Sequence, residues 1–153
     1  STRDWSSDVC SSDLNGTRAL QACRGARRVL VGSFLNLCAV ADWLAREGVQ
    51  ELLIVCSGTH EEAAYEDVLG AGALCDAVWA QFVSGHVADS AQVAREIYQQ
   101  GRGDLLVAVQ RARNARRLLA LPDLREDVAV CLQRDSLPVL AELCADGAVR
   151  MLK

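Results

Sequence analysis

The chain has 153 residues, of which 51% are hydrophobic and 24% charged, and its formal net charge is −4. This length suits one globular domain with a core of its own, and the apolar content argues against disorder. A negative net charge argues against a nucleic-acid partner, because phosphate contacts need a basic surface. We expect no membrane association either, since no apolar run approaches the roughly 20 residues of a membrane span.

Residues 1–14 differ in composition from the rest of the chain. They contain five serines and three aspartates, and a Ser-Ser-Asp triplet recurs within them. They follow neither a helical nor a strand period. We interpret them as a poorly packed, non-native leader that resembles a translated sequencing-adapter tail, with a natural disordered tail as the alternative. Residues 15–153 then form the folded domain, and we expect the native protein to have more sequence upstream.

The first half of residues 15–153 alternates between helix and strand patterns. In chain order we expect a helix over 15–25, a strand over 28–31, a helix over 34–47, a strand over 51–56 and a long helix over 61–81. Gly48 is placed to end the second helix. The run Leu-Leu-Ile-Val over 52–55 does not alternate, which is typical of a strand covered on both faces of a parallel sheet. Gly70 and Gly72 in the long helix each cost about 1 kcal/mol relative to alanine, so we expect close packing there.

The second half is richer in helices. The expected elements are a helix over 89–100, a helix over 105–121 with an arginine-rich centre, a strand over 127–132, a short helix over 137–143 and a strand over 148–152. The strand–helix order over 28–81 predicts a right-handed βαβ unit. We therefore predict an α/β class: a layered fold with a mostly parallel sheet and helices on both faces, as an incomplete domain.

Seven cysteines are scattered along the chain. The absence of a Cys-x-x-Cys pair excludes a zinc ribbon or a thioredoxin motif. Because five of them lie in apolar runs, we expect buried, reduced thiols in a cytoplasmic protein. These are Cys23, Cys38, Cys56, Cys75 and Cys131.

Two predicted strand ends carry a glycine and hydroxyl side chains, at 32–33 and at 57–59. Ligands of α/β sheets bind at the carboxyl ends of strands, and glycine lets backbone N–H groups approach an anion there. Each loop alone fits a phosphate or carboxylate site, but an ordinary turn capped by Ser or Thr is favoured. His60 beside the second loop fits an acid–base group or, more commonly, a solvated side chain.

Glu66 and Asp67 lie near the start of the long predicted helix. Mg²⁺ takes oxygen ligands from one or two carboxylates and from a substrate phosphate. Early carboxylates also stabilise the helix dipole, which the composition alone favours. Other phosphate chemistries are excluded: no Walker motif exists, and a cysteine-phosphatase loop from Cys56 would need an arginine where Glu62 stands.

Taken together, four segments resemble the 2-phosphosulfolactate phosphatase family. They are Asn-Gly-Thr-Arg-Ala-Leu over 15–20, Val-Leu-Val-Gly-Ser-Phe-Leu-Asn over 29–36, Val-Cys-Ser-Gly-Thr over 55–59 and Glu-Asp-Val-Leu-Gly-Ala-Gly-Ala-Leu over 66–74, with a weaker match over 126–131. The chain departs from the family at Gly70, where a cysteine is usual, and around 111–115, where a serine and a glycine are usual. The Asp- and Gly-rich motifs that the family carries before Asn15 are also missing.

The resemblance implies a Mg²⁺-dependent phosphatase that hydrolyses 2-phosphosulfolactate to sulfolactate and phosphate, as in coenzyme M biosynthesis, with residues 15–153 as its C-terminal part. It implies that Glu66 and Asp67 hold the metal and take part in catalysis. The implied ligands of the small anionic phosphorylated substrate, which we expect to converge on one cleft, are Asn15, Gly16, Thr17, Arg18, Ser33, Asn36, Ser57, Gly58 and Thr59.

A non-catalytic anion-binding or interaction module of the same fold is the alternative, because a fold alone does not define a function. The sequence leaves the oligomeric state open, a homo-oligomer included. We expect this chain to be a weak or inactive catalyst, because groups that act as a unit lose activity together when some are missing.

Overall fold

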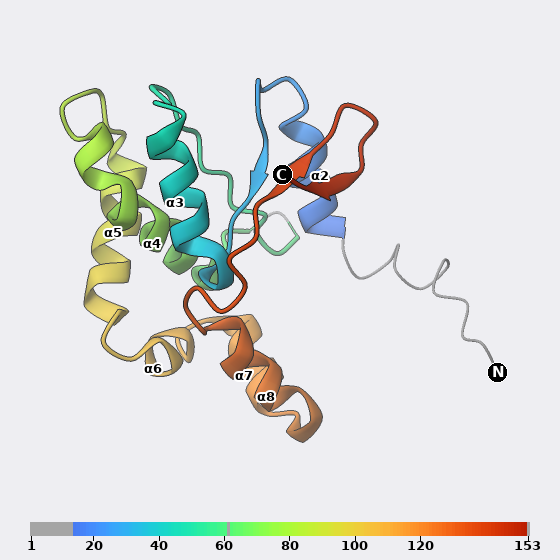
Figure 1. Ribbon diagram of the computed structural model, residues 1–153. Coiled ribbons are helices and arrows are strands. Elements are labelled where there is room, and N and C mark those ends of the chain that lie inside the picture. Colours follow the sequence, from blue (N-terminus) through green and yellow to red (C-terminus); the bar gives the residue numbers. More distant parts are fainter. Residues whose placement is uncertain (1–13, 61, 153) are drawn as a thin grey trace.

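The computed structural model describes residues 14–60 and 62–152, which Figure 1 shows as a ribbon. The prediction of a separate leader over 1–14 lies outside these residues, apart from Leu14, where α2 begins. In chain order the elements are α2 (Leu14–Ala22), β1 (Leu30–Val31), the 3₁₀ turn η1 (Phe34–Asn36), α3 (Leu37–Arg46), α4 (Tyr65–Phe82), α5 (Asp89–Gly101), α6 (Leu105–Val109), α7 (Arg113–Leu119), the 3₁₀ turn η2 (Pro122–Leu124), α8 (Arg125–Cys131), β2 (Ala141–Leu143) and β3 (Val149–Met151). The predicted α/β class is confirmed.

Helix α3 ends where the sequence predicts, at a glycine with left-handed backbone. Gly48 has a φ of +59°, and its N–H donates to the carbonyl of Ala45. The N–H of Val49 donates to the carbonyl of Leu44. This Schellman pattern satisfies carbonyl groups that the helix end would otherwise leave free.

Helices α4 and α5 pack closely because Gly72 lacks a side chain. A Cβ at this position would overlap the carbonyl oxygen of Ala94 on α5 and would lie 2.9 Å from the Cβ of Tyr98. The predicted close packing is therefore confirmed at Gly72. A Cβ on Gly70 would meet only the ring of Phe34, at 4.0 Å.

An ion pair and an aromatic contact join the same two helices. Asp76 on α4 accepts from Nε of Arg95 at 2.9 Å and from Nε2 of Gln99 at 2.8 Å. The Arg95 guanidinium lies 4.2 Å from the ring centroid of Trp79, within reach of a cation–π interaction. The side chains of Asp76 and Arg95 are partly buried, so solvent screens this pair less than an exposed one.

The strands of the described structure form one antiparallel sheet in the order β1–β2–β3. Leu30 lies opposite Glu142, and Glu142 lies opposite Arg150. Arg28 reinforces the first pairing through an ion pair with Glu142 at 2.8 Å. The predicted mostly parallel sheet with a βαβ unit is thus wrong for the described residues, because a hairpin from the end of the chain, and not residues 51–56, pairs with β1.

Residues 51–56 belong to no strand of the described structure. In Figure 1 the ribbon between α3 and α4 passes β1 without becoming an arrow. Leu52 packs against the cluster of buried side chains around Trp43, whereas Leu53 is 84% exposed. The predicted strand is therefore wrong here, because an apolar run becomes a strand only where a neighbour supplies the ladder hydrogen bonds.

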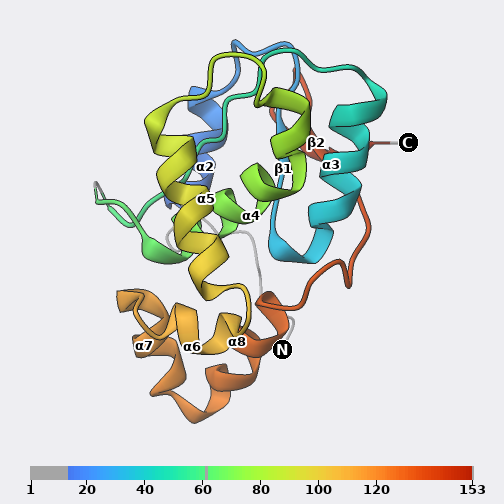
Figure 2. The ribbon, with the colours of Figure 1, turned by 90° about the vertical axis from the view of Figure 1, so that its left-hand side faces the viewer.

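The predicted helix over 105–121 is divided into α6 and α7. The chain turns at 110–112, and Ala112 in this turn is fully buried. It packs with Val109, Ala115 and Val128, which brings α6, α7 and α8 together. In Figures 1 and 2 these three helices form a group at the same end of the molecule, below α4 and α5.

Two further sequence predictions are wrong in the second half. Residues 127–132 lie mostly in α8, where Val128 is buried and Leu132 partly buried one turn later. The predicted helix over 137–143 is an irregular segment followed by β2. Pro138 lacks an N–H and disfavours a helix, and residues 141–143 instead find strand partners on both sides.

The centre of the core lies between η1, α3, α4 and α5. Leu69 and Tyr98 are the largest side chains with less than 2% exposure, and they share a cluster with Phe34 and Leu37. Leu, Val and Ala form most of the core, as their abundance predicts, and three aromatic side chains, Phe34, Trp43 and Tyr98, are buried in it as well. No helix in residues 14–60 and 62–152 combines the length and apolarity that a bilayer crossing needs.

The prediction of buried cysteines is wrong for most of them. Cys75 on α4 is buried, Cys23 is intermediate, and the other three of the predicted set are exposed. Apolar neighbours in sequence do not bury a thiol at a helix end or in an unpaired segment, where one side faces solvent. The described cysteines are free thiols, as predicted.

Candidate active site

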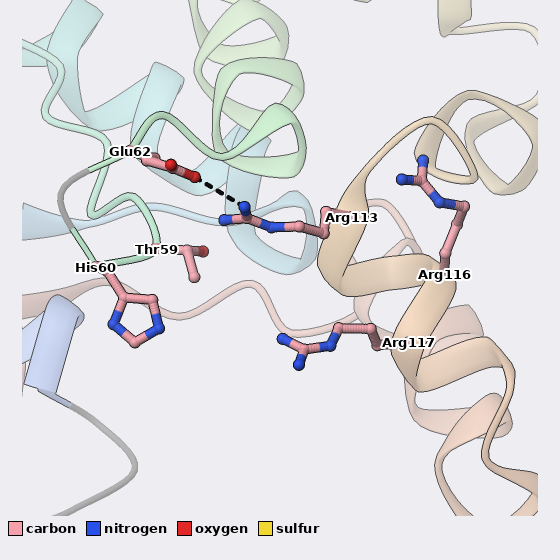
Figure 3. Close-up of a pocket in the computed structure, with 6 residues that line it drawn as sticks. All are labelled: Thr59, His60, Glu62, Arg113, Arg116 and Arg117. Atoms are coloured by element: carbon pink, nitrogen blue, oxygen red, sulfur yellow. Dashed lines mark hydrogen bonds and ion pairs between the residues drawn. The ribbon is translucent and has the colours of Figure 1, made fainter.

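A groove of about 760 Å³ separates the loop before α4 from helix α7. We call it the arginine groove, and Figure 3 shows its six lining residues: Thr59, His60, Glu62, Arg113, Arg116 and Arg117. Among the described residues, three guanidinium groups line the groove against one carboxylate, so their balance of charge is positive. An anion is therefore the ligand class that it fits best.

The three arginines face different directions. Arg113 and Arg117 extend from α7 toward the loop that carries Thr59 and His60, whereas Arg116 points away from it (Figure 3). Arg116 Nη1 donates to the carbonyls of Gln110 and Arg111, at 3.3 and 2.6 Å. Its position is thus set by the turn between α6 and α7, and Arg113 and Arg117 supply the charge that faces the loop.

The loop opposite α7 is a tight turn closed by its own backbone. The N–H of Thr59 donates to the carbonyl of Glu62 at 2.9 Å, and the N–H of Glu62 donates back at 3.2 Å. Gly58 has a φ of +69°, and a Cβ there would lie 2.6 Å from the carbonyl oxygen of Glu62. Only glycine fits this position, which explains the glycine that the sequence places after 51–56.

The predicted anion cradle at 57–59 uses its donors within the protein. The N–H of Gly58 donates to Oδ2 of Asp67 at 2.7 Å, and the Ser57 hydroxyl donates to the same oxygen at 3.1 Å. Because the N–H of Thr59 is also bonded, these three donors of the predicted cradle are not free for an anion.

Both predicted metal ligands join this loop through hydrogen bonds. Asp67 holds Ser57 and Gly58, as described above. Glu66 accepts from Nδ2 of Asn114 at 2.7 Å, and the same amide donates to Oγ1 of Thr59 at 2.6 Å. The structure therefore brings the carboxylates of α4, the predicted loop and α7 into one network.

The two carboxylates match part of what a Mg²⁺ ion needs. Each uses one oxygen, Glu66 Oε1 or Asp67 Oδ2, in the bonds above; among the described residues, no hydrogen bond reaches the other oxygen of either. One or two carboxylates suffice for Mg²⁺ when waters and substrate phosphate complete its shell. The described residues contain no group of three or more His, Cys, Asp or Glu placed to hold a metal. What the structure supports is that each carboxylate has one oxygen available to a Mg²⁺ ion that is shared with substrate.

Two other predicted substrate ligands, Ser33 and Asn36, are hydrogen-bonded to each other, and Asn36 is buried at the end of β1. Asn36 is 6% exposed, and its amide nitrogen donates to the carbonyls of Val31 and Val139 at 3.0 and 2.9 Å. Its amide oxygen accepts from the N–H and the hydroxyl of Ser33, at 2.8 and 3.1 Å. These four bonds use the capacity of the amide. Asn36 thus ties the end of β1 to the segment before β2.

The four predicted ligands Asn15, Gly16, Thr17 and Arg18 lie on α2. Thr17 and Arg18 are exposed. Figures 1 and 2 both place the N-terminal end of α2 near the loop that precedes α4, and the same end borders the view in Figure 3. The structure thus joins 57–59 directly to Asp67 and, through Asn114, to Glu66, and it places α2 in their vicinity.

Sequence reasoning missed the groove side of α7. Arg113, Asn114 and Arg117 were visible only as part of an arginine-rich helix, and nothing in the sequence places them beside a loop more than 50 residues earlier. Cys56 next to the loop is a poor nucleophile, because desolvation and the Asp67 carboxylate raise the pKa of its thiol. This agrees with the missing cysteine-phosphatase motif.

The fold and the site define an α/β protein with a positively charged groove beside paired carboxylates. The family model described as 2-phosphosulpholactate phosphatase matches residues 6–146. The chain belongs to this family.

Individual relatives are about one-third identical to the chain over the aligned segments. A "Probable 2-phosphosulfolactate phosphatase" of Symbiobacterium thermophilum is 32% identical over 145 residues, which cover 95% of this chain and 61% of the relative. A protein of the same name from Nostoc punctiforme is 35% identical over 146 residues, or 93% and 59% of the two chains. One from Prochlorococcus marinus is 35% identical over 131 residues, or 84% and 54%. The chain thus spans little more than half the length of these relatives.

Proposed function

We propose that this chain carries part of the active site of a cytoplasmic, Mg²⁺-dependent phosphatase that hydrolyses 2-phosphosulfolactate to sulfolactate and phosphate, as in coenzyme M biosynthesis. The observation that carries the proposal is the arginine groove beside Glu66 and Asp67. Guanidinium groups bind anionic oxygens through forked N–H donors, and the small phosphorylated substrate is such an anion. The relatives are named as probable 2-phosphosulfolactate phosphatases, which supports the same assignment.

Glu66 and Asp67 would hold the metal through Glu66 Oε2 and Asp67 Oδ1. When bound, Mg²⁺ neutralises charge on phosphoryl oxygens. Asn114 orients Glu66 by donating to its other oxygen, and Gly58 does the same for Asp67. Phosphoryl transfer depends mainly on positioning and charge neutralisation. Carboxylates that the protein holds in place and an adjacent cationic groove supply both.

The N-terminal end of α2 would complete the substrate site. Arg18 offers a fork for an anionic oxygen, and Thr17 offers a hydroxyl. Both side chains are exposed, which leaves them accessible to a ligand. Asn36, whose amide is fully bonded, would act through the position of Ser33 and the end of β1.

The metal role predicts a loss of activity in Glu66→Gln and in Asp67→Asn. We expect Mg²⁺-dependent phosphate release from 2-phosphosulfolactate to fall about a hundredfold in each. Asparagine at 67 keeps an acceptor for the Gly58 N–H, so the loop should stay folded while the metal charge is lost. Phosphate release with Mg²⁺ and with EDTA measures the effect. Water-proton relaxation by Mn²⁺, a paramagnetic substitute for Mg²⁺, reports metal binding even where turnover is slow.

Asp127→Asn is the matched control. Asp127 lies in the first turn of α8, so it has the same helix-dipole position as Asp67, but it forms no hydrogen bond to the loop at 57–59. We expect Mn²⁺ binding and phosphate release to stay unchanged in this variant. An equal loss in Asp127→Asn, or phosphate release that persists in EDTA, would contradict the metal role.

A non-catalytic anion-binding module is the second candidate. Its support is that the N–H groups of Gly58 and Thr59 already have protein acceptors, so these two backbone donors are not free for a transition state. Binding of inorganic phosphate without turnover at any Mg²⁺ concentration would favour it.

A further inference from the structure

Arg113 and Arg117 form the cationic wall of the groove. They are four residues apart on α7, so they share one helix face. Figure 3 shows both guanidinium groups directed toward Thr59 and His60 across the groove. Two like charges at this spacing repel each other by a few tenths of a kcal/mol. An anion between them would remove that repulsion.

Glu62 neutralises only part of this wall. Its carboxylate lies 2.8 Å from Nη1 of Arg113, and the two side chains are 68% and 53% exposed. An ion pair this exposed is weak, so a ligand anion can compete for Arg113. Within the described part of the chain, Arg117 forms no ion pair.

Asn114 connects this wall to the proposed metal ligands. It lies next to Arg113 in α7 and donates to Glu66. Arg113 and Arg117 therefore flank the carboxylate network without belonging to it. A ligand that reaches both the carboxylates and the arginines must carry two acidic groups. One would bind the metal held by Glu66 and Asp67, and the other would bind the arginines.

We propose that Arg113 and Arg117 form a second-anion subsite that binds the non-phosphate acid of the substrate, a sulfonate or carboxylate, and so determines specificity. This rests on the proposed function, with the phosphate placed at Glu66 and Asp67. Two guanidinium forks match the planar or tetrahedral oxygens of these acids through charge-assisted hydrogen bonds. A phosphomonoester with an uncharged remainder has no group for this wall.

Titration with sulfoacetate tests the subsite without turnover, because this probe has a sulfonate and a carboxylate but no phosphate. Isothermal calorimetry in EDTA should show binding to the full chain, about tenfold weaker in Arg117→Gln. Arg117→Lys, which keeps the charge but loses the fork, should recover part of the affinity. Arg111→Gln is the control: it removes the same charge from a residue that does not line the groove. Equal weakening in Arg111→Gln and Arg117→Gln, or none in Arg117→Gln, would overturn the proposal.

Kinetics separate this subsite from the proposed function. In Arg117→Gln, kcat/KM for 2-phosphosulfolactate should fall about tenfold, while kcat/KM for p-nitrophenyl phosphate, which has no second acid, stays unchanged. Equal losses for both substrates would place the phosphate at Arg117 and overturn the subsite. If the unmodified chain hydrolyses neither substrate, as the expected weak or inactive catalyst would, the sulfoacetate titration decides the subsite by itself.

Discussion

At the scale of single residues, the predicted ligands differ in the hydrogen-bonding capacity that they keep. Asn36 uses all of its amide groups on protein partners. Asp67 and Glu66 use one oxygen each, and within the described part of the chain no hydrogen bond reaches the other oxygen. In the sequence, both kinds are polar side chains near the start of a predicted helix. The difference depends on which carbonyls and N–H groups come within about 3 Å, which is a tertiary property.

The charge of Asp146 makes the β2–β3 hairpin sensitive to acid. Arg150 donates to both oxygens of Asp146 at 2.8 and 2.6 Å, and this bond, with that from the Ala148 N–H, lowers the pKa of Asp146 to about 2. Because folding lowers the pKa of Asp146, the ion pair with Arg150 contributes its full stabilisation above pH 3.8, which is the pKa of this carboxyl in the unfolded chain. That stabilisation is lost as the pH falls through about 2. Asp146→Asn should therefore lower the melting temperature at pH 7, and the difference from the unmodified chain should vanish near pH 2.

Thermal melts of both chains from pH 7 to pH 2 measure this. Glu51→Gln, an exposed carboxylate with no ion pair among the described residues, should leave the melting temperature unchanged throughout. A difference between Asp146→Asn and the unmodified chain that is constant with pH would show that the ion pair has no part in it. Because both side chains are 56% exposed, the effect should also shrink at high salt.

At the scale of elements, periodicity predicts where helices form but not where they break. The helices at 34–47 and 89–100 have one apolar face and one regular end, and both are confirmed with small shifts. The helix expected over 105–121 breaks at Ala112, because burying that residue against α8 outweighs one more helical turn. Such a break follows from a partner element that is distant in the chain.

The packing of α4 on α5 predicts opposite effects for two neighbouring glycines. Gly72→Ala should destabilise the fold by about 1–3 kcal/mol, because the new methyl group overlaps the backbone of Ala94 and forces the helices apart. Gly70→Ala is the matched control. Its methyl would lie 4.0 Å from the Phe34 ring, and the better helix propensity of alanine should stabilise the fold by up to about 1 kcal/mol. Urea unfolding of the two variants measures both, and similar effects of the two substitutions would contradict this packing.

At the scale of the whole molecule, residues 51–56 are an apolar segment with one covered side. Leu52 packs on the core, whereas Leu53 and Val55 are 84% and 47% exposed. Exposed apolar side chains on a segment without strand partners promote association. Leu53→Ser should leave the unfolding free energy nearly unchanged and reduce self-association, as measured by light scattering against protein concentration.

Leu52→Ser is the counterpart on the covered side. It should lower stability by about 2 kcal/mol, because it removes a partly buried side chain from the cluster around Trp43. If Leu53→Ser destabilises the fold as much as Leu52→Ser, the segment is covered on both sides in solution. The chain spans only part of its relatives' length, so the same pair of variants in a longer relative would show whether the second face becomes buried there.

The sequence by itself determined the α/β class, most helix positions, the glycine that ends α3 and the family, because these depend on local propensity, period and motif order. It also identified Glu66, Asp67 and the loop at 57–59 as neighbours of one site. Only the tertiary structure decided the antiparallel sheet, the unpaired segment at 51–56 and the use of α7 as the wall of the groove. Each of these depends on contacts between residues far apart in the chain, such as Asn114 with Glu66 and β1 with β2. Local patterns do not specify which distant surfaces meet.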